Sequence, residues 1–268
     1  MEMEFYKPKH EGLRKYIEGY YFISPGDSPK PLHYWTFPNN FFIISVSKGI
    51  EIEMQESKIV VKPSSQQNII ANYVARYTTP IEVLCEGVVN EITIYFKPLG
   101  INHFIDDPQT LFKQKSAKNF NPFLDFLSTM EEVFEEQDRE FQREKLEEYW
   151  LSKLNTADLD LMENILKDVE ADLKIDDIAQ KRNFSRQYLN KIFTKNVGKS
   201  ASEYRKIHRF RKSIFKQKDT KNLTELSYDS LFYDQSHLVK DFKQLTHVSP
   251  NAFFKKVDTR QGNLWLFI

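Results

Sequence analysis

The chain has 268 residues, of which 40% are hydrophobic and 28% are charged. Single domains cluster at roughly 100–150 residues, so this length predicts two domains of a globular protein. No apolar run approaches the roughly 18 residues of a membrane span, and the acidic start lacks the features of a signal peptide. We therefore expect a cytoplasmic protein without membrane contact. Cys85 is the only cysteine, which excludes intramolecular disulfides and a Cys-rich zinc site.

The net charge of zero hides an uneven distribution. Residues 173–258 hold 19 Lys and Arg against 9 Asp and Glu, whereas residues 1–172 hold 18 against 29. A basic C-terminal segment behind an acidic remainder is typical of a nucleic-acid-binding module joined to a different domain. A surface imbalance without functional meaning is the alternative that this count leaves open.

Residues 15–100 are rich in short runs of β-branched and aromatic residues, separated by Pro, Gly, Asn and Ser. The runs are YIEGYYFIS, HYWTF, FFIISVS, IEIEMQES, KIVVK, IEVLCEGVV and EITIYF. Strands at this spacing predict a barrel or a double sheet. Their aromatic residues favour an ordinary core over a ligand pocket. The candidates for such a pocket are Tyr20, Tyr21, Trp35, Phe37, Tyr73, Tyr77 and Tyr95.

From about Phe120 to Leu154 the apolar residues recur at helical spacing, which predicts a helical hairpin that packs on the β-rich domain or forms a dimer interface. The polar stretch that follows marks a domain boundary, after which Thr156 or Asp158 is expected to cap a helix. The predicted organisation is residues 1–155 as a β-rich sensor or dimerisation domain with C-terminal helices, 156–258 as a DNA-binding domain, and 259–268 as a tail.

Residues 173–207 predict a short helix, a tight turn and a second helix with a polar face. Asp176 is expected to cap the first helix, and Ser185 the second. Asn183 falls where the turn needs a left-handed residue, and Gly198 supplies the C-terminal stop. These features define a helix-turn-helix. The outward face of its second helix carries side chains suited to bases and phosphates: Arg186, Gln187, Asn190, Lys191 and Lys195.

Residues 223–256 repeat the first copy at an offset of 49, and Thr224 is expected to cap the first helix of this repeat. Residues 200–217 should form one connecting helix of about 27 Å, which can hold two recognition helices roughly 34 Å apart, about one turn of DNA. The polar residues of the second recognition helix are Gln235, Ser236, Lys240 and Lys243. The connecting helix offers Arg205, Lys206, Arg209, Arg211 and Lys212 to phosphates.

The stretch FYDQSHLVKDFKQLTHVSP, together with the first copy, closely resembles the AraC/XylS family of transcription regulators. The resemblance implies an α+β protein, with an N-terminal cupin-like barrel and flanking helices before an all-α domain of two helix-turn-helix units. It also implies a homodimeric regulator with promoter DNA, RNA polymerase and a small-molecule effector as partners. We expect an activator, with a repressor as the alternative that the sequence leaves open. The implied base contacts are Gln187, Asn190 and Lys191 in the first copy, and Gln235, Ser236 and Lys240 in the second.

The second copy departs from the family pattern at three positions. Leu231 and His247 stand where the family has Gly, and Ser227 stands where it has Ala. A β-carbon at a left-handed turn costs about 1–2 kcal/mol. We therefore expect the first copy to carry more of the base-specific affinity.

The N-terminal half gives no sign of catalysis. His10, His33 and His103 are far apart in the sequence and no His-x-His occurs, so we expect no cupin metal centre, no cofactor and no enzyme. The alternative is that this half is an enzyme or a partner-binding module that the DNA-binding domain tethers to DNA.

Overall fold

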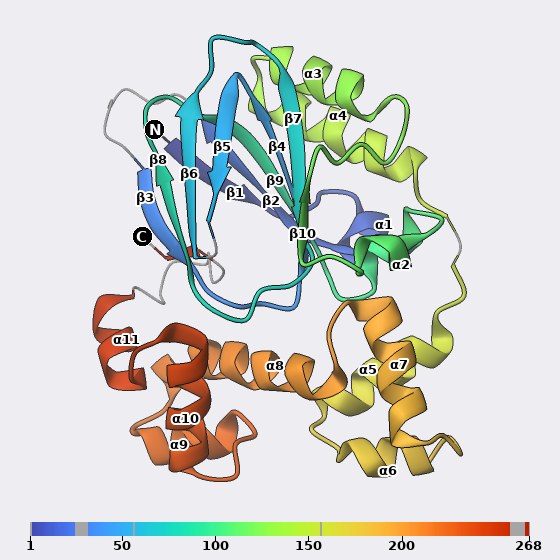
Figure 1. The fold of residues 1–268 in the computed structure, drawn as a ribbon, viewed down its shortest axis with the longest axis vertical. Helices are drawn as coiled ribbons and strands as arrows, with labels where there is room; N and C mark the ends of the chain where they lie inside the picture. The colour runs from blue at the N-terminus through green and yellow to red at the C-terminus, as the bar shows by residue number, and fades with distance from the viewer. Residues whose placement is uncertain (1, 25–31, 56, 156, 258–265, 268) are drawn as a thin grey trace.

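The computed structural model describes residues 2–24, 32–55, 57–155, 157–257 and 266–267. Figure 1 shows a β-rich N-terminal part lying against a row of helices from the C-terminal part. The predicted α+β class, with a β-rich first part and a helical second part, is confirmed. Among these described residues, no helix has the length and apolar character that crossing a membrane would require.

The N-terminal part consists of two sheets with the orders β1–β2–β9–β4–β7–β10 and β11–β3–β8–β6–β5. The strands of the first sheet are β1 (Glu2–Tyr6), β2 (Ile17–Ser24), β4 (Phe42–Lys48), β7 (Ile69–Val74), β9 (Asn90–Phe96) and β10 (Ser116–Lys118). Those of the second are β3 (Leu32–Thr36), β5 (Ile50–Met54), β6 (Lys58–Pro63), β8 (Ile81–Cys85) and β11 (Leu266–Phe267). Each predicted run contains a strand, whereas β1, β7, β10 and β11 were not predicted. In β7, Ala71 and Asn72 have low β-propensity, but pairing with β4 and β10 on both sides compensates.

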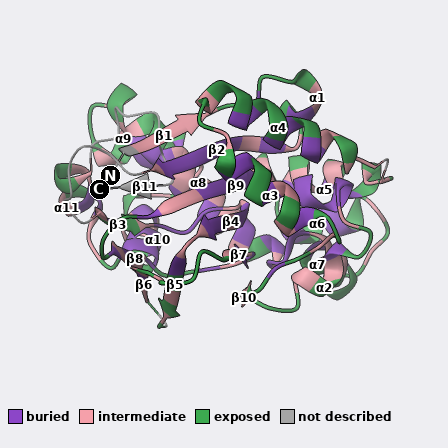
Figure 2. Cartoon of the chain, turned by 90° about the horizontal axis from the view of Figure 1, so that it is seen from above, coloured by how far each residue is buried: buried purple, intermediate pink, exposed green. Residues whose placement is uncertain are grey.

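The first sheet has different neighbours on its two faces. In β9, Ile92 and Ile94 join the core that the sheet shares with helices. Glu91, Thr93 and Tyr95 alternate with them and line the space between the two sheets. Figure 2 shows β2 largely in the colour of buried residues, with exposed residues on the outer faces of α3 and α4. Both faces of this sheet are therefore covered by other elements.

The helices of the N-terminal part are α1 (Glu11–Arg14), η1 (Gly100–His103), α2 (Pro108–Leu111), α3 (Phe126–Glu135) and α4 (Arg139–Ser152). The last two form the predicted hairpin, and their apolar stripe packs on the first sheet. Trp150 is fully buried, with its ring centroid 4.9 Å from that of Phe96 and 5.5 Å from that of Phe104. Asp138 begins α4 by accepting hydrogen bonds from the backbone amides of Glu140 and Phe141.

The C-terminal part has two small cores joined by one long helix. Its helices are α5 (Asp160–Glu170), α6 (Ile175–Gln180), α7 (Arg186–Val197), α8 (Ala201–Lys216), η2 (Gln217–Asp219), α9 (Leu223–Asp229), α10 (Gln235–Thr246) and α11 (Pro250–Lys256). Leu189 of α7 packs in the first core with Tyr204 of α8. Phe242 of α10 packs in the second core with Phe210, also of α8. The connecting helix therefore belongs to both cores.

Two predicted N-caps in this part are wrong. Lys174, not Asp176, precedes α6, and Asp176 lies in the first turn of that helix. Asn222, not Thr224, caps α9, because its side-chain oxygen accepts a hydrogen bond from the backbone amide of Glu225 at 2.9 Å. The connecting helix α8 is 16 residues long, two fewer than predicted.

The start of α5 also differs from the prediction. Leu159 occupies the N-cap position and offers no side-chain hydrogen bond. The carboxylate of Asp158 accepts a hydrogen bond from the backbone amide of Asp160 at 3.3 Å, so it supports the first turn from one position upstream. The other predicted cap, Thr156, lies outside the described residues.

Candidate nucleic-acid interface

Each copy of the motif brings two helices together across a turn with one left-handed residue. In the first copy this residue is Asn183, with a φ of 55°, and the amide of Phe184 donates a hydrogen bond to the carbonyl oxygen of Ala179 at 2.9 Å. In the second copy it is Leu231, with a φ of 66°, and the amide of Phe232 donates to the carbonyl oxygen of Ser227 at 2.8 Å. The two turns thus share one geometry despite different residues.

The second turn contains one additional residue. Asn183 and Leu231 are equivalent at an offset of 48, whereas the helix caps Ser185 and Asp234 are equivalent at an offset of 49. The insertion is Tyr233, whose side chain is 85% exposed. The offset of 49 found in the sequence therefore applies from the recognition helix onward, and the second recognition helix is preceded by an aromatic side chain that the first copy lacks.

The second helices of the two copies, α7 and α10, lie at opposite ends of α8 (Figure 1). Both begin with a side-chain cap, in which Ser185 accepts from the amide of Tyr188 and Asp234 accepts from that of His237. Most of the predicted contact residues are exposed on them, and only Asn190 is half-buried. The exposed ones are Arg186, Gln187, Lys191, Lys195, Gln235, Ser236, Lys240 and Lys243.

Two of these side chains already have partners within their own copy. A guanidinium nitrogen of Arg186 lies 3.1 Å from the carboxylate of Asp176, and the hydroxyl of Thr224 donates a hydrogen bond to Gln235 at 2.9 Å. In each case a residue on the first helix of the motif holds a residue at the start of the second. A DNA contact by either side chain would replace an interaction that is present in the free protein.

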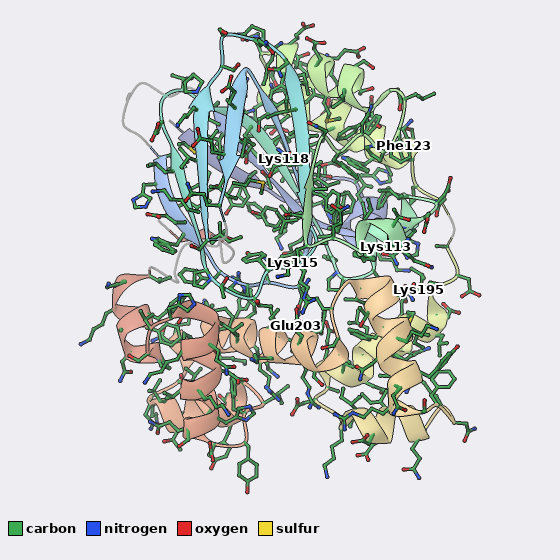
Figure 3. The ribbon with its side chains drawn as sticks, viewed as in Figure 1. Lys113, Lys115, Lys118, Phe123, Lys195 and Glu203 are labelled. Carbon is green, nitrogen blue, oxygen red and sulfur yellow. The ribbon has the colours of Figure 1, made fainter. Side chains whose placement is uncertain are left out.

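Lys195 lies at the opposite end of α7 from Arg186. Figure 3 shows it at the end of the helix that is turned toward the N-terminal part. There α7 contacts α2, and Gly198, with a φ of 76°, lies so close to Phe112 that a β-carbon on it would come within 2.7 Å of that ring. A DNA contact by Lys195 stays a prediction. The N-terminal part lies close to this end of α7, which argues against such a contact.

The connecting helix does not offer all of its basic residues to phosphates. Arg209, predicted to contact phosphate, is buried, and its guanidinium lies 3.3 Å from the carboxylate of Asp172 and 3.4 Å from that of Asp241. That prediction is corrected, because Arg209 instead connects the segment before α6 to α10. Arg205 and Lys206 are half-buried, with polar partners in Asp172 and in Gln244 respectively.

The second copy carries strain at its C-terminal cap, as its sequence predicted. His247 ends α10 in the left-handed region, with a φ of 63°, at the position where Gly198 ends α7. Because glycine adopts this conformation without a steric penalty, we expect His247→Gly to raise the free energy of unfolding by about 1 kcal/mol. Denaturant unfolding of the two proteins checks this value. The equivalent change at Gln244, which is in regular helix, should destabilise instead.

A first contact between the two parts surrounds the start of α8. Arg76, just after β7, forms a two-pronged ion pair with Glu203, with 2.7 Å between Nε and one carboxylate oxygen. Beside it, the fully buried ammonium group of Lys199 donates a hydrogen bond to the backbone oxygen of Ala75 at 2.8 Å. Burial lowers the pKa of Lys199 to about 8. Figure 3 shows Glu203 on the side of α8 that is turned toward the loop of Lys115.

A second contact lies near the end of α8. The guanidinium of Arg211 donates hydrogen bonds to the backbone oxygen of Pro38, at 2.8 Å, and to that of Phe37. It also forms a hydrogen bond with the side chain of Tyr77. Burial lowers the pKa of Arg211 to about 10. The ring of Phe37 packs on that of Phe253 in α11 with 5.0 Å between centroids. Arg211 was predicted to be available to phosphates, but it binds the N-terminal part instead.

The candidate aromatic pocket is divided among three places. Tyr20 and Tyr73 belong to the core beneath α3 and α4. Trp35 and Phe37 line a hollow of about 340 Å³ between the two parts, together with residues of α10 and α11. Tyr21, Tyr77 and Tyr95 line a cavity between the two sheets. Six of the seven aromatics are buried, whereas Trp35 is exposed, and strand alternation sends the buried ones to different faces.

Comparison with known proteins agrees with this geometry. Residues 178–256 match the family model described as a helix-turn-helix domain. The chain is 36% identical over 86 residues to the Msm operon regulatory protein of Streptococcus mutans, an alignment that covers 32% of this chain and 31% of that protein. The chain thus spans about a third of the length of this curated relative.

Solved structures of ToxT from Vibrio cholerae are also similar. One is 15% identical with a TM-score of 0.46 and covers 95% of this chain and 98% of that one. A second, of ToxT bound to an unsaturated fatty acid, is 17% identical with a TM-score of 0.44 and covers 87% of this chain and 92% of that one.

The C-terminal part is therefore a DNA-binding domain built from two helix-turn-helix units. Its resemblance to the AraC/XylS regulators, carried by the residues around Phe232 and α10, is confirmed, and the domain is of that type.

Proposed function

We propose that this protein is a transcription regulator that reads two successive major grooves of promoter DNA through α7 and α10. The observation that carries the proposal is the placement of two exposed polar helix faces at the two ends of one connecting helix. A helix of 16 residues is about 24 Å long, and recognition helices packed at its ends approach the roughly 34 Å repeat of the duplex. Their Gln, Asn and Lys side chains suit base edges and phosphates.

In this proposal residues 1–155 are a sensor or dimerisation domain and residues 156–258 are the DNA-binding domain. The contacts of Arg76 and Arg211 join the two, so a change in the first domain can alter how the second meets DNA. A small effector in the N-terminal domain, a homodimer, RNA polymerase as a partner and a cytoplasmic location complete the proposal. The protein would act by binding rather than by catalysis.

Lys191 and Lys240 test the recognition helices most directly. The described residues offer neither side chain a hydrogen bond or an ion pair, so both can meet DNA without breaking an existing contact. Genome-wide mapping of bound sites supplies the DNA, which is then titrated with the full chain at fixed salt. We expect Lys191→Ala and Lys240→Ala each to weaken binding about tenfold, with the larger loss at Lys191, and to reduce the salt slope by about 1.

The matched control for these two variants is Lys62→Ala, which removes one exposed charge from β6 in the N-terminal part. It should leave the affinity for the mapped sites unchanged. Equal affinities for the wild-type chain and all three variants would reject α7 and α10 as the recognition helices.

A further inference from the structure

A cavity of about 90 Å³ lies between the two sheets of the N-terminal part. Strands of both sheets line it, and six of its fourteen lining residues are Ile or Val. Its other lining residues include four tyrosines, Tyr21, Tyr34, Tyr77 and Tyr95, and the carboxyl group of Glu91. A space with this lining has the composition of a small-ligand site, in which apolar and aromatic walls surround a few fixed polar groups.

Glu91 is the unusual member of this lining. One carboxylate oxygen accepts a hydrogen bond from the hydroxyl of Thr93 at 2.8 Å, and the other accepts one from the hydroxyl of Ser47 at 3.2 Å. Within the part of the chain that the structure describes, no Lys, Arg or His forms an ion pair with it. Glu91 is half-buried, and desolvation raises the pKa of its carboxyl group above the ordinary value. A cationic partner would therefore stabilise its charged form. The two hydroxyl groups hold the carboxyl in place for it.

The tyrosines supply the second half of a cation site. Tyr34 and Tyr95 keep their hydroxyl protons, because burial raises the pKa of both well above its ordinary value. Tyr21 and Tyr95 lie on the neighbouring strands β2 and β9 with 5.6 Å between ring centroids, and Tyr77 belongs to the same cluster. Tyr34 lies on β3 of the second sheet, so both sheets contribute a tyrosine to the lining. The face of an aromatic ring attracts a cation, most strongly where water is excluded.

We propose that this cavity binds a small organic ammonium ion, whose positive nitrogen pairs with Glu91 while its carbon atoms contact the tyrosine rings. The described lining offers no basic group to an anion. A cavity of about 150 Å³ accepts benzene, so this smaller one suits a ligand of about four non-hydrogen atoms. That this ligand is the effector of the regulator rests on the proposed function. That the cavity binds an ammonium ion is independent of the proposed function.

Tyr77 gives the site a route to the DNA-binding part. Its ring lines the cavity, and its hydroxyl donates to the backbone oxygen of Phe37 at 2.6 Å and bonds to Arg211 of α8. A ligand that moves this ring would disturb the contact at the end of α8. The same side chain thus belongs both to the proposed ligand site and to the contact between the two parts.

Isothermal titration calorimetry of the full chain, without DNA, tests the proposal. The probes are n-propylammonium and tetramethylammonium chlorides, with propan-1-ol as the neutral isostere, propionate as the anion and sodium chloride as the salt control. We expect both ammonium ions to bind at least tenfold more tightly than propan-1-ol or propionate. Equal binding of the alcohol and the amine, or no binding of either ammonium ion, would overturn the proposal.

Variants then locate the binding site. Glu91→Gln keeps the shape of the side chain and removes its charge, and it should weaken ammonium binding at least tenfold. Glu86→Gln removes an exposed carboxylate just after β8 and should leave binding unchanged. If Glu91→Gln binds the ammonium ions as tightly as the wild type, Glu91 is not part of the binding site and the proposal is wrong. If that variant does not fold, the comparison of the ammonium ions with propan-1-ol and propionate on the wild-type chain still shows whether the cavity prefers a positive charge. Because no DNA is present, the outcome is independent of the recognition-helix test.

Discussion

Replacing Arg211 with alanine is expected to lower the free energy of unfolding by about 3 kcal/mol, because hydrogen bonds from a charged donor contribute roughly 1.5–3 kcal/mol each. The guanidinium lies between α8 and the segment after β3, where it donates hydrogen bonds to the backbone oxygens of Phe37 and Pro38. Alanine would leave the oxygen of Pro38 without this donor in a buried place, and it would remove the arginine contact with Tyr77. The loss falls on the boundary between the two parts, so the variant should also unfold less cooperatively.

Calorimetry and denaturant unfolding of the full chain measure this effect. Lys212→Ala is the control, because Lys212 is the next residue of α8 and is half-buried, and the described residues give its side chain no hydrogen bond or ion pair. The expected result is a lower midpoint and a broadened or split transition for Arg211→Ala, with a midpoint close to that of the wild type for Lys212→Ala. Coincident single transitions for all three proteins would contradict the role of Arg211 in joining the two parts.

Lys199 should make the stability of the protein rise with pH in the alkaline range. Burial lowers its pKa to about 8 in the folded chain, from an ordinary value near 10.5 that applies when the chain is unfolded. Between these two values the unfolded chain binds more protons than the folded chain, so the free energy of unfolding increases with pH. From about pH 7.5 to pH 10 this group alone should add about 2 kcal/mol.

The pH effect is isolated by comparison with Lys199→Met, which fills a similar volume without a charge. The difference in unfolding free energy between wild type and variant, followed across this pH range in denaturant, should change by about 2 kcal/mol in favour of the wild type. Lys191→Met, in the exposed face of α7, should show no such change. A difference that stays constant with pH would mean that Lys199 has the same pKa in the folded and unfolded chains.

The parts of the DNA-binding domain that were predicted correctly depend on local geometry. Ser185 caps α7, Asn183 takes the left-handed turn position, and Gly198 ends the helix, all as expected from a few neighbouring residues. Where two candidates lay close together, sequence reasoning failed. Asn222 and Thr224 are both good cap residues, and only the chain path around α9 selects Asn222.

Predictions that depended on distant partners were less successful. A count of basic residues treats Lys206, Arg209 and Arg211 alike, but their surroundings come from segments far away in the chain. Arg209 meets Asp172 and Asp241, and Arg211 meets backbone oxygens more than 170 positions upstream. An arginine on an amphipathic helix could have been placed on the buried or the exposed side only with knowledge of what covers that helix.

Glu91 was missed although the sequence contained a usable sign of it. In EITIYF, polar and apolar residues alternate, which by itself predicts a strand with one face in water. Helices cover the apolar face of β9, and the second sheet covers the polar face. A polar strand face therefore became the wall of a cavity, and that depends on the packing of two sheets, which strand periodicity does not reveal.

The ion pairs of Arg209 have a consequence for how DNA would be selected. By connecting the segment before α6 to α10, they cross-link the two reading units and limit adjustment of one against the other. When a reader cannot adapt its spacing, the duplex must bend or twist to fit it, at an energy that depends on its sequence. Base pairs between the two contacted grooves, which no side chain touches, should then influence affinity through their stiffness, with flexible pyrimidine–purine steps favoured there.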